Sequence, residues 1–235
     1  MKINPNKSKA LSFTRARVKD PLNYSLGDQK IPEATCCKYL GIMIRSDLSW
    51  AGQVNYTVLK ACRALHFVMR IVKKGNKNTK SLAYMSLVRP ILENGKVCWD
   101  PYREYQIRAL DRVLNKAAKF AHHSGGSEWE PLAKGRTIAR MCAPYKAYTG
   151  DRSWRVIGDR LQAPSYLSRV AYYYYYYYYW KIRARKQRTD VGKYSFVNRS
   201  ITYWNKLPEG AIGASHGKTR IFEMTIRKVK TSEGK

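Results

Sequence analysis

The chain has 235 residues, of which 45 are Lys or Arg and 16 are Asp or Glu, so its formal net charge is +29. Because 44% of the residues are hydrophobic, the chain can form a core, which excludes a wholly disordered basic tail. The charge predicts a polyanionic partner, since lysines and arginines that neutralise phosphates release condensed counterions. The alternative interpretation is a basic surface that only keeps the protein in solution.

The cysteine pattern and the hydropathy predict an intracellular protein, nuclear or cytoplasmic. The five cysteines form no C-x-x-C pair, which argues against a disulfide framework and a zinc site. We expect them to be buried as small hydrophobic residues. No stretch approaches the ~18 apolar residues that a membrane helix needs, and no apolar segment typical of a signal peptide follows the first lysine. No membrane partner is therefore expected.

Residues 1–49 have the pattern of short strands. The segments "SKALSFTR", "LNYSL" and "QKIPEA" are separated by turn-forming residues, and the β-branched run "CCKYLGIMI" follows them. We expect a small antiparallel sheet here.

A long helix follows, with Asp47 or Ser49 as its cap. Its apolar side is predicted from residues spaced by three and four: Val54, Val58, Cys62, Leu65, Met69 and Val72. Its opposite face carries the cations Lys60, Arg63, Arg70, Lys73 and Lys74. One side should pack while the other stays positive.

Two further helices are predicted. The first begins near Thr79 and ends at Pro90. The second begins at Asp100-Pro101, where Asp100 is expected to cap and Pro101 to take the first helical position. This helix carries Arg103, Arg108, Arg112, Lys116 and Lys119 outside its apolar face and ends at His122.

The remainder, from residue 124, is less regular. We expect a helix that includes Tyr145 and is broken at Gly150, a strand or short helix in "YSFVNRSITYWNKLP", and an amphipathic stretch "RIFEMTIRKVK". The elements together predict an α+β fold with a small N-terminal antiparallel sheet, a mainly helical bundle and a small irregular α/β C-terminal segment. The predicted domains are 1–49, 50–123 and 124–235.

Eight consecutive tyrosines, residues 172–179, precede Trp180 and a basic run. Stacking of nucleic-acid bases on such rings is chemically possible. However, eight identical residues alternate sides in a strand and surround a helix, so they cannot form one face. We interpret the run as an expanded repeat and place the backbone contacts on the cations that follow: Lys181, Arg183, Arg185, Lys186 and Arg188.

Five segments in order resemble the carboxy-terminal part of the reverse transcriptase of jockey-type, LINE-like non-LTR retrotransposons. They are "INPNKSK", "CCKYLGIMIRSDLSW", "LVRPILENGKVCWDPY", "IRALDRVLNKAAKF" and "FVNRSITYWNKLPEGAI". The resemblance implies that residues 1–49 are the end of a palm and that residues 50–123 are a thumb whose basic faces follow the template–primer backbone. The last of the five is similar to the segment after the thumb.

The resemblance also implies roles for single residues. Asn4 and Lys7 match an asparagine and a lysine near the end of the palm, and the lysine is expected close to the phosphates of the incoming nucleotide. The segment from Lys38 to Gly41 is similar to the turn and strand that position the end of the primer. Glycine there would let a nucleic-acid backbone approach closely. The implied partners are DNA, RNA or their hybrid.

The catalytic residues of such a polymerase are missing from this chain. A two-metal mechanism needs converging carboxylates, usually with an Asp-Asp pair, and the sequence has no two adjacent acidic residues. His122 and His123 have no carboxylate or thiol at a metal-ligand spacing. We therefore expect no catalytic residue, metal or other cofactor in this chain. The parent enzyme would use two divalent ions, with magnesium the expected metal, and its catalytic palm and fingers would lie upstream of Met1.

Three functional hypotheses remain. The first is a non-catalytic reverse transcriptase fragment that binds nucleic-acid backbones without sequence preference. The second is a subunit that works in trans with a separate palm-bearing element protein. The third is a decayed reading frame whose product has no function.

Overall fold

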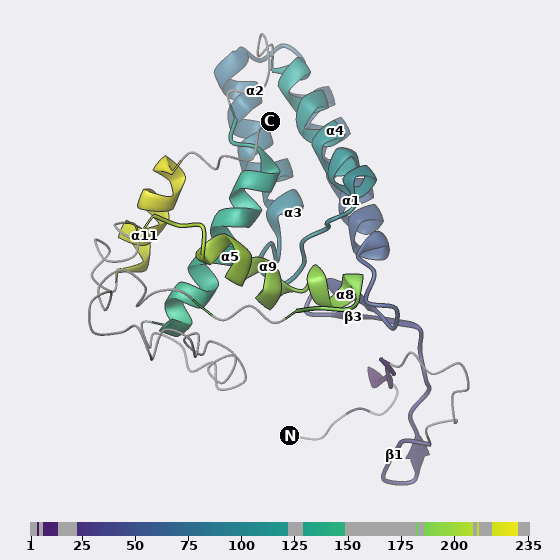
Figure 1. Cartoon of the computed structure of the whole chain (residues 1–235). Coiled ribbons are helices and arrows are strands. Elements are labelled where there is room, and N and C mark those ends of the chain that lie inside the picture. Colours follow the sequence, from purple (N-terminus) through teal and green to yellow (C-terminus); the bar gives the residue numbers. More distant parts are fainter. Residues whose placement is uncertain are drawn as a thin grey trace, which may run out of the picture. The chain divides into compact units, whose positions relative to one another are not determined.

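The structure, a computed structural model, describes residues 4, 7–13, 23–121, 129–148, 182, 186–208, 211 and 218–229. The chain divides into two compact units (Figure 1). Unit 1 comprises Met1–Gly95 and Pro101–Trp129, and unit 2 comprises Lys96–Asp100 and Glu130–Lys235. Short antiparallel sheets near the N-terminus precede the helices, which confirms the predicted α+β class. None of the described helices has the length and apolar character needed to cross a membrane.

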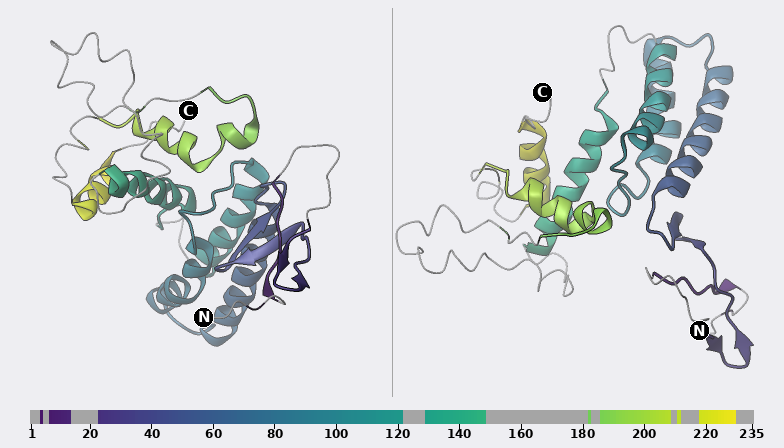
Figure 2. Two further views of the ribbon diagram at one scale, coloured as in Figure 1. Left: turned by 90° about the horizontal axis from the view of Figure 1, so that it is seen from below. Right: turned by 45° about the vertical axis from the view of Figure 1, so that its right-hand side comes forward.

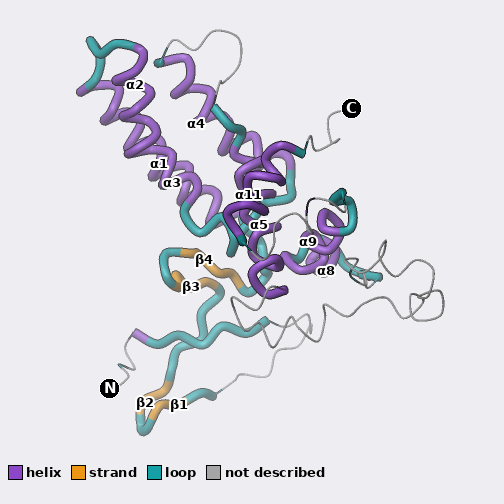
Figure 3. Tube along the Cα trace, turned by 90° about the vertical axis from the view of Figure 1, so that its left-hand side faces the viewer, coloured by secondary structure: helices purple, strands orange, loops and turns teal. Residues whose placement is uncertain are grey.

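The predicted N-terminal strands form two antiparallel pairs in unit 1. Strand β1 (Ser25–Leu26) pairs with β2 (Gln29–Lys30), and β3 (Cys36–Tyr39) pairs with β4 (Ile42–Arg45). Figure 3 shows the hairpin of β3 and β4 close to one end of the long helices of unit 1. Among the described residues of this region, the small antiparallel sheet expected from the sequence is two separate two-stranded sheets.

The β3–β4 hairpin turns through Leu40 and Gly41, which both have a positive φ, 47° and 85° respectively. Two-residue hairpin turns need this conformation because it matches the twist of the strands. A Cβ atom on Gly41 would meet only the Asn94 side chain, at 3.8 Å, so backbone conformation and not crowding requires the glycine. Leucine at Leu40 is strained, because a side chain disfavours positive φ.

We expect Gly41→Ala to lower the free energy of unfolding by about 1–2 kcal/mol, because alanine disfavours the left-handed region. Leu40→Asn should instead raise the free energy of unfolding, by less than about 1 kcal/mol. Asparagine tolerates positive φ, and Leu40 is 85% exposed, so little packing is lost. Denaturant unfolding of both variants measures these changes. Equal stability of all three proteins would contradict the described turn.

Helix α1 (Ala51–Ile71) buries a slightly different face from the predicted one. Its buried residues are Gln53, Val54, Thr57, Ala61, Leu65 and Val68, whereas Val58, Cys62, Met69 and Val72 are only half-buried. Gln53 can be buried because its amide accepts a hydrogen bond from the backbone N–H of Met43 at 2.8 Å and donates one to the Thr57 hydroxyl at 3.2 Å. The apolar pattern alone missed these satisfied polar residues.

The predicted cap of α1 is wrong, because the N-cap residue is Trp50 and its side chain makes no capping hydrogen bond. The Ser49 hydroxyl, one residue earlier, accepts a hydrogen bond from the Ala51 N–H at 3.3 Å. Asp47 instead accepts from the Ser49 N–H and pairs with Arg45, 3.0 Å away, which holds the pKa of the Asp47 carboxyl below its usual value.

A helical run from Lys77 to Glu93 replaces the predicted helix from Thr79 to Pro90. It consists of α2 (Lys77–Ala83), the π-turn η2 (Tyr84–Val88) and α3 (Arg89–Glu93). The prediction that Pro90 ends the helix is wrong. Proline lacks an N–H and its ring clashes with the carbonyl four residues earlier, and the wider turn just before Pro90 accommodates both effects.

Helix α4 (Glu104–Phe120) packs beside α1 in unit 1, as Figure 1 and the right panel of Figure 2 show. Its buried residues include Leu110, Val113, Leu114 and Ala117. The predicted start at Asp100-Pro101 is wrong, because the N-cap is Arg103. Asp100 pairs with two arginines instead.

In unit 2, the Asp100 carboxylate binds two arginines that are distant in sequence. One oxygen lies 2.5 Å from Nη1 of Arg140 and 2.9 Å from Nη1 of Arg199, which also donates to the Asp100 backbone carbonyl at 3.1 Å. The Arg140 side chain is 3% exposed, and its guanidinium lies 4.7 Å from the centre of the Tyr203 ring. Burial lowers the pKa of Arg140, while the Asp100 charge opposes that shift. A buried charge needs such a partner.

The described helices of unit 2 are α5 (Leu132–Tyr148), α8 (Asp190–Lys193), α9 (Phe196–Trp204) and α11 (Thr219–Lys228). The segment "YSFVNRSITYWNKLP", expected as a strand or short helix, therefore contains the short helix α9. Tyr145, Trp204 and Phe222 are buried in the core of unit 2, where the rings of Tyr145 and Phe222 stack with centres 3.9 Å apart. The predicted break at Gly150 and the tyrosine run lie outside the described residues.

The cysteines are free thiols and are less buried than expected. Four are half-buried, and Cys98 is exposed. Burial raises the pKa of the Cys142 thiol to about 11. A thiol with a raised pKa forms little thiolate at neutral pH, so Cys142 should be unreactive.

Candidate nucleic-acid interface

One exposed face of α1 combines cations with aromatic rings. Tyr56, Lys60, Arg63, Phe67 and Arg70 are spaced alternately by four and three residues, which places them along one line of a helix. Lys74 continues the spacing in the turn after α1. All six side chains are exposed, and we call them the α1 stripe.

The α1 stripe lies in a part of the sequence that has no acidic residue. Between Asp47 and Glu93 the chain has eight Lys or Arg residues and no Asp or Glu. Within the described part of the chain, the structure has no ion pair to Lys60, Arg63, Arg70 or Lys74. Their charges are therefore not neutralised by carboxylates and are exposed to an anion in solution.

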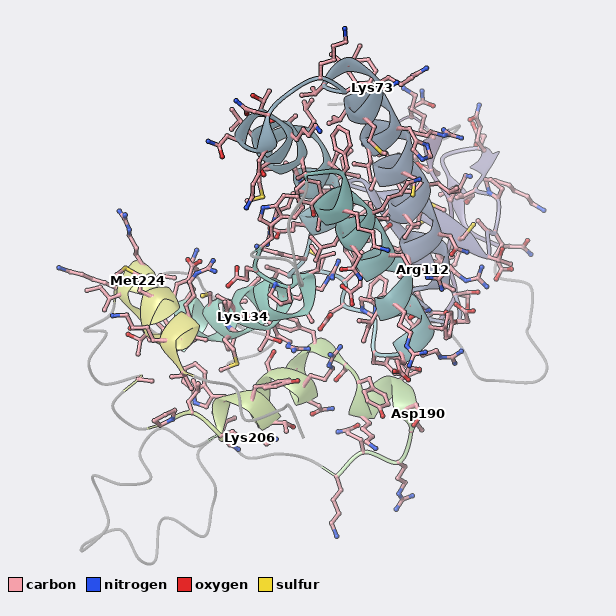
Figure 4. The ribbon with its side chains drawn as sticks, turned by 90° about the horizontal axis from the view of Figure 1, so that it is seen from above. Lys73, Arg112, Lys134, Asp190, Lys206 and Met224 are labelled. Atoms are coloured by element: carbon pink, nitrogen blue, oxygen red, sulfur yellow. The ribbon has the colours of Figure 1, made fainter. Side chains whose placement is uncertain are left out.

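Beside the stripe, α1 has an open depression of about 650 Å³ lined by Arg63, His66, Met69 and Arg70. Lys116 of α4 lies here, with its Nζ 2.7 Å from Nε2 of His66. An ammonium group can only donate, so Nε2 of His66 is the acceptor in this contact. Lys116 thereby joins the cations of α4 to those of α1. Figure 4 labels Lys73, near the end of α1, and Arg112 on α4.

The aromatic end of the stripe contacts the β3–β4 hairpin through Lys38. The Lys38 ammonium donates a hydrogen bond to the Tyr56 hydroxyl at 2.9 Å and lies 4.6 Å from the centre of the ring. This hydrogen bond lowers the pKa of Tyr56. Lys38 is exposed, so the ring and a cation are presented together at this point.

The structure brings most of the sequence-predicted cations of unit 1 to two neighbouring helices. Lys60, Arg63, Arg70, Lys73 and Lys74 are exposed along α1 and the turn after it, and Lys116 contacts them through His66. Arg108 and Arg112 are exposed on α4, and Arg108 pairs with Glu104. Lys7 is exposed in the N-terminal segment.

The predicted cations of the C-terminal basic run are only partly described. Lys186 and Arg188 are exposed in unit 2. Lys181, Arg183 and Arg185 lie outside the described residues.

Sequence reasoning missed the rings of the stripe and His66. Tyr56 and Phe67 do not belong to the buried face of α1. They are eleven residues apart and share the four-and-three spacing of the cations. That spacing was the signal for exposed rings, because residues at these spacings share a face.

Among the described residues, no His, Cys, Asp and Glu side chains are grouped in threes or more to hold a metal ion. The arrangement of unit 1 is instead that of a cationic surface with exposed rings. Searches against protein-family models, curated proteins and solved structures found no match for the chain.

Proposed function

We propose that this chain binds the phosphate backbone of nucleic acids without sequence preference, through the basic faces of α1 and α4. In this proposal the chain is a non-catalytic fragment of the retrotransposon reverse transcriptase that its sequence resembles, and unit 1 has the role of the thumb. The observation that carries the proposal is the α1 stripe with its exposed cations, none of which pairs with a carboxylate in the described structure.

Three physical arguments support phosphate as the ligand. On α1 the stripe runs from Tyr56 to Arg70, about 21 Å along the helix, and Lys74 extends it into the following turn. This length exceeds the size of a small anion and suits a polymer. Its positive charges follow one line, as a linear polyanion requires. Arginine also binds phosphate in a bidentate manner, and the stripe contains two arginines.

The proposal predicts a steep dependence of affinity on salt. If the four cations of the stripe each neutralise one phosphate, the affinity for an RNA–DNA hybrid should fall about 150-fold between about 50 and 200 mM salt. Fluorescence anisotropy with a labelled hybrid measures this slope. Hybrids of unrelated sequence should give the same slope and similar affinities, because phosphate contacts carry no sequence information.

An affinity that changes less than about threefold over this salt range would overturn the proposal, since even one phosphate contact gives that change. A strong preference among sequences would contradict the absence of base readout. The circular dichroism of the protein should be recorded at each salt concentration, so that a loss of binding is not confused with unfolding.

A further inference from the structure

The exposed rings of the α1 stripe are not needed for phosphate binding. Tyr56 and Phe67 are 37% and 52% exposed, and a ligand that covered their apolar surface would gain free energy. Phe67 has Arg63 and Arg70 at the neighbouring helix positions, four and three residues away. Each ring is therefore next to cations on the same face.

A ring beside a cation matches the chemistry of one nucleotide. The base has a flat π-face that stacks on aromatic side chains, and the adjacent phosphate is anionic. At Tyr56 a ring and a cation are already next to each other, because the Lys38 ammonium lies 4.6 Å from the ring centre. At Phe67 the guanidinium groups of Arg63 and Arg70 provide the cations.

We infer that the α1 stripe binds single-stranded nucleic acid, with bases stacked on Tyr56 and Phe67 and phosphates on the cations between them. The inference rests on the proposed function and identifies the form of nucleic acid that the stripe binds best, while duplexes are bound through their phosphates alone. In a duplex the base faces are covered by neighbouring base pairs, so rings on a helix surface contact no base face. Only an unpaired strand gains from both parts of the stripe.

The spacing of the rings suits one strand. Eleven residues of α-helix separate them, which corresponds to about 16 Å. A strand with bases about 3.4 Å apart covers that distance in roughly five nucleotides, and a more extended strand covers it in fewer. A single strand that follows the helix can therefore reach both rings without leaving the cations Lys60 and Arg63 between them.

A protein partner fits this surface less well. It would have to cover the two rings while it neutralises the four surrounding cations, in a region with no carboxylate between Asp47 and Glu93. Burying such charges without partners is costly. Charge complementarity therefore favours a polyanion that also carries flat apolar groups.

The test compares three labelled probes of about 15 nucleotides: oligothymidine, an abasic strand of equal length and a duplex of equal length. The abasic strand has the same phosphates but no bases. We expect wild-type protein to bind oligothymidine more tightly than the abasic strand. Tyr56→Ala and Phe67→Ala should each weaken oligothymidine binding about tenfold and leave abasic-strand and duplex binding nearly unchanged.

Two further variants separate stacking from structural damage. Phe67→Tyr keeps a ring and should keep the affinity. Leu82→Ala removes a comparably apolar side chain, 69% exposed, from α2, outside the stripe, and should change nothing. Circular dichroism and the melting temperature of each variant confirm folding.

The outcomes distinguish this inference from the proposed function. Salt-sensitive binding of all three probes, with no selective effect of the ring variants, would overturn the stacking inference and leave backbone binding intact. If the ring variants lose equal affinity for the abasic strand and for oligothymidine, the stacking inference is also overturned. No salt-sensitive binding of any probe would overturn the proposed function itself.

Discussion

Reversal of three charges on the α1 stripe, Arg63→Glu, Arg70→Glu and Lys74→Glu together, should reduce the affinity for nucleic acid by about 500-fold or more at about 0.1 M salt. Loss of three phosphate contacts alone accounts for a factor of this size. Each new carboxylate also repels the backbone, so the measured loss should exceed that value. The plot of log affinity against log salt should become less steep by about 2.7.

The matched control carries the same charge change in unit 2. Lys193, Arg220 and Lys228 are exposed on α8 and α11, and their triple Glu variant has the same net charge as the stripe variant. Because it leaves the stripe intact, we expect a loss below about tenfold, caused only by weaker long-range attraction. If both variants lose affinity equally, net charge and not the stripe determines binding.

Asp100→Asn should lower the free energy of unfolding of unit 2 by about 3–5 kcal/mol. Asparagine has nearly the same shape but no charge, so the Arg140 guanidinium, 97% buried, would lose its carboxylate partner. Arg199, 2.9 Å from the same oxygen, would lose its partner as well. Denaturant unfolding measures the global change, and hydrogen exchange of the amides in α5 and α9 reports whether the loss lies in unit 2.

Two variants test the cause of that loss. Asp47→Asn removes a carboxylate from an exposed pair with Arg45, whose side chains are 44% and 50% exposed, and should cost less than about 1 kcal/mol. Adding Arg140→Met to Asp100→Asn removes the unpaired buried charge and should restore part of the stability. A change of less than 1 kcal/mol for Asp100→Asn alone would show that Arg140 does not depend on Asp100.

The pairing of Asp100 with Arg140 and Arg199 also explains why Lys96–Asp100 belongs to unit 2, although its neighbours in sequence belong to unit 1. Trp99 is buried, with the Arg136 guanidinium 4.9 Å from its ring centre, and Asp100 binds Arg140 and Arg199. Two adjacent residues thus attach this short segment to α5 and α9. Ring burial and charge pairing act together here.

The sequence by itself determined what depends on neighbours along the chain. The helix that begins at Ala51, its basic face and the short N-terminal strands follow from periodicity, turn residues and local charge, and the α+β class follows from their order. The cations of the α1 stripe were predictable for the same reason, because a helix places residues three and four apart on one face.

Only the tertiary structure decided features that depend on distant partners. Asp100 has the local pattern of a helix cap, but it binds arginines 40 and 99 residues away, because the charge of Arg140 is buried and requires a carboxylate. Gln53 can be buried because its amide oxygen accepts a hydrogen bond from the Met43 N–H of the hairpin. Lys38 reaches the Tyr56 hydroxyl because the hairpin lies beside α1. Burial and pairing are set by the packing of separate elements, and the spacing of residues along the chain contains no information about which elements meet.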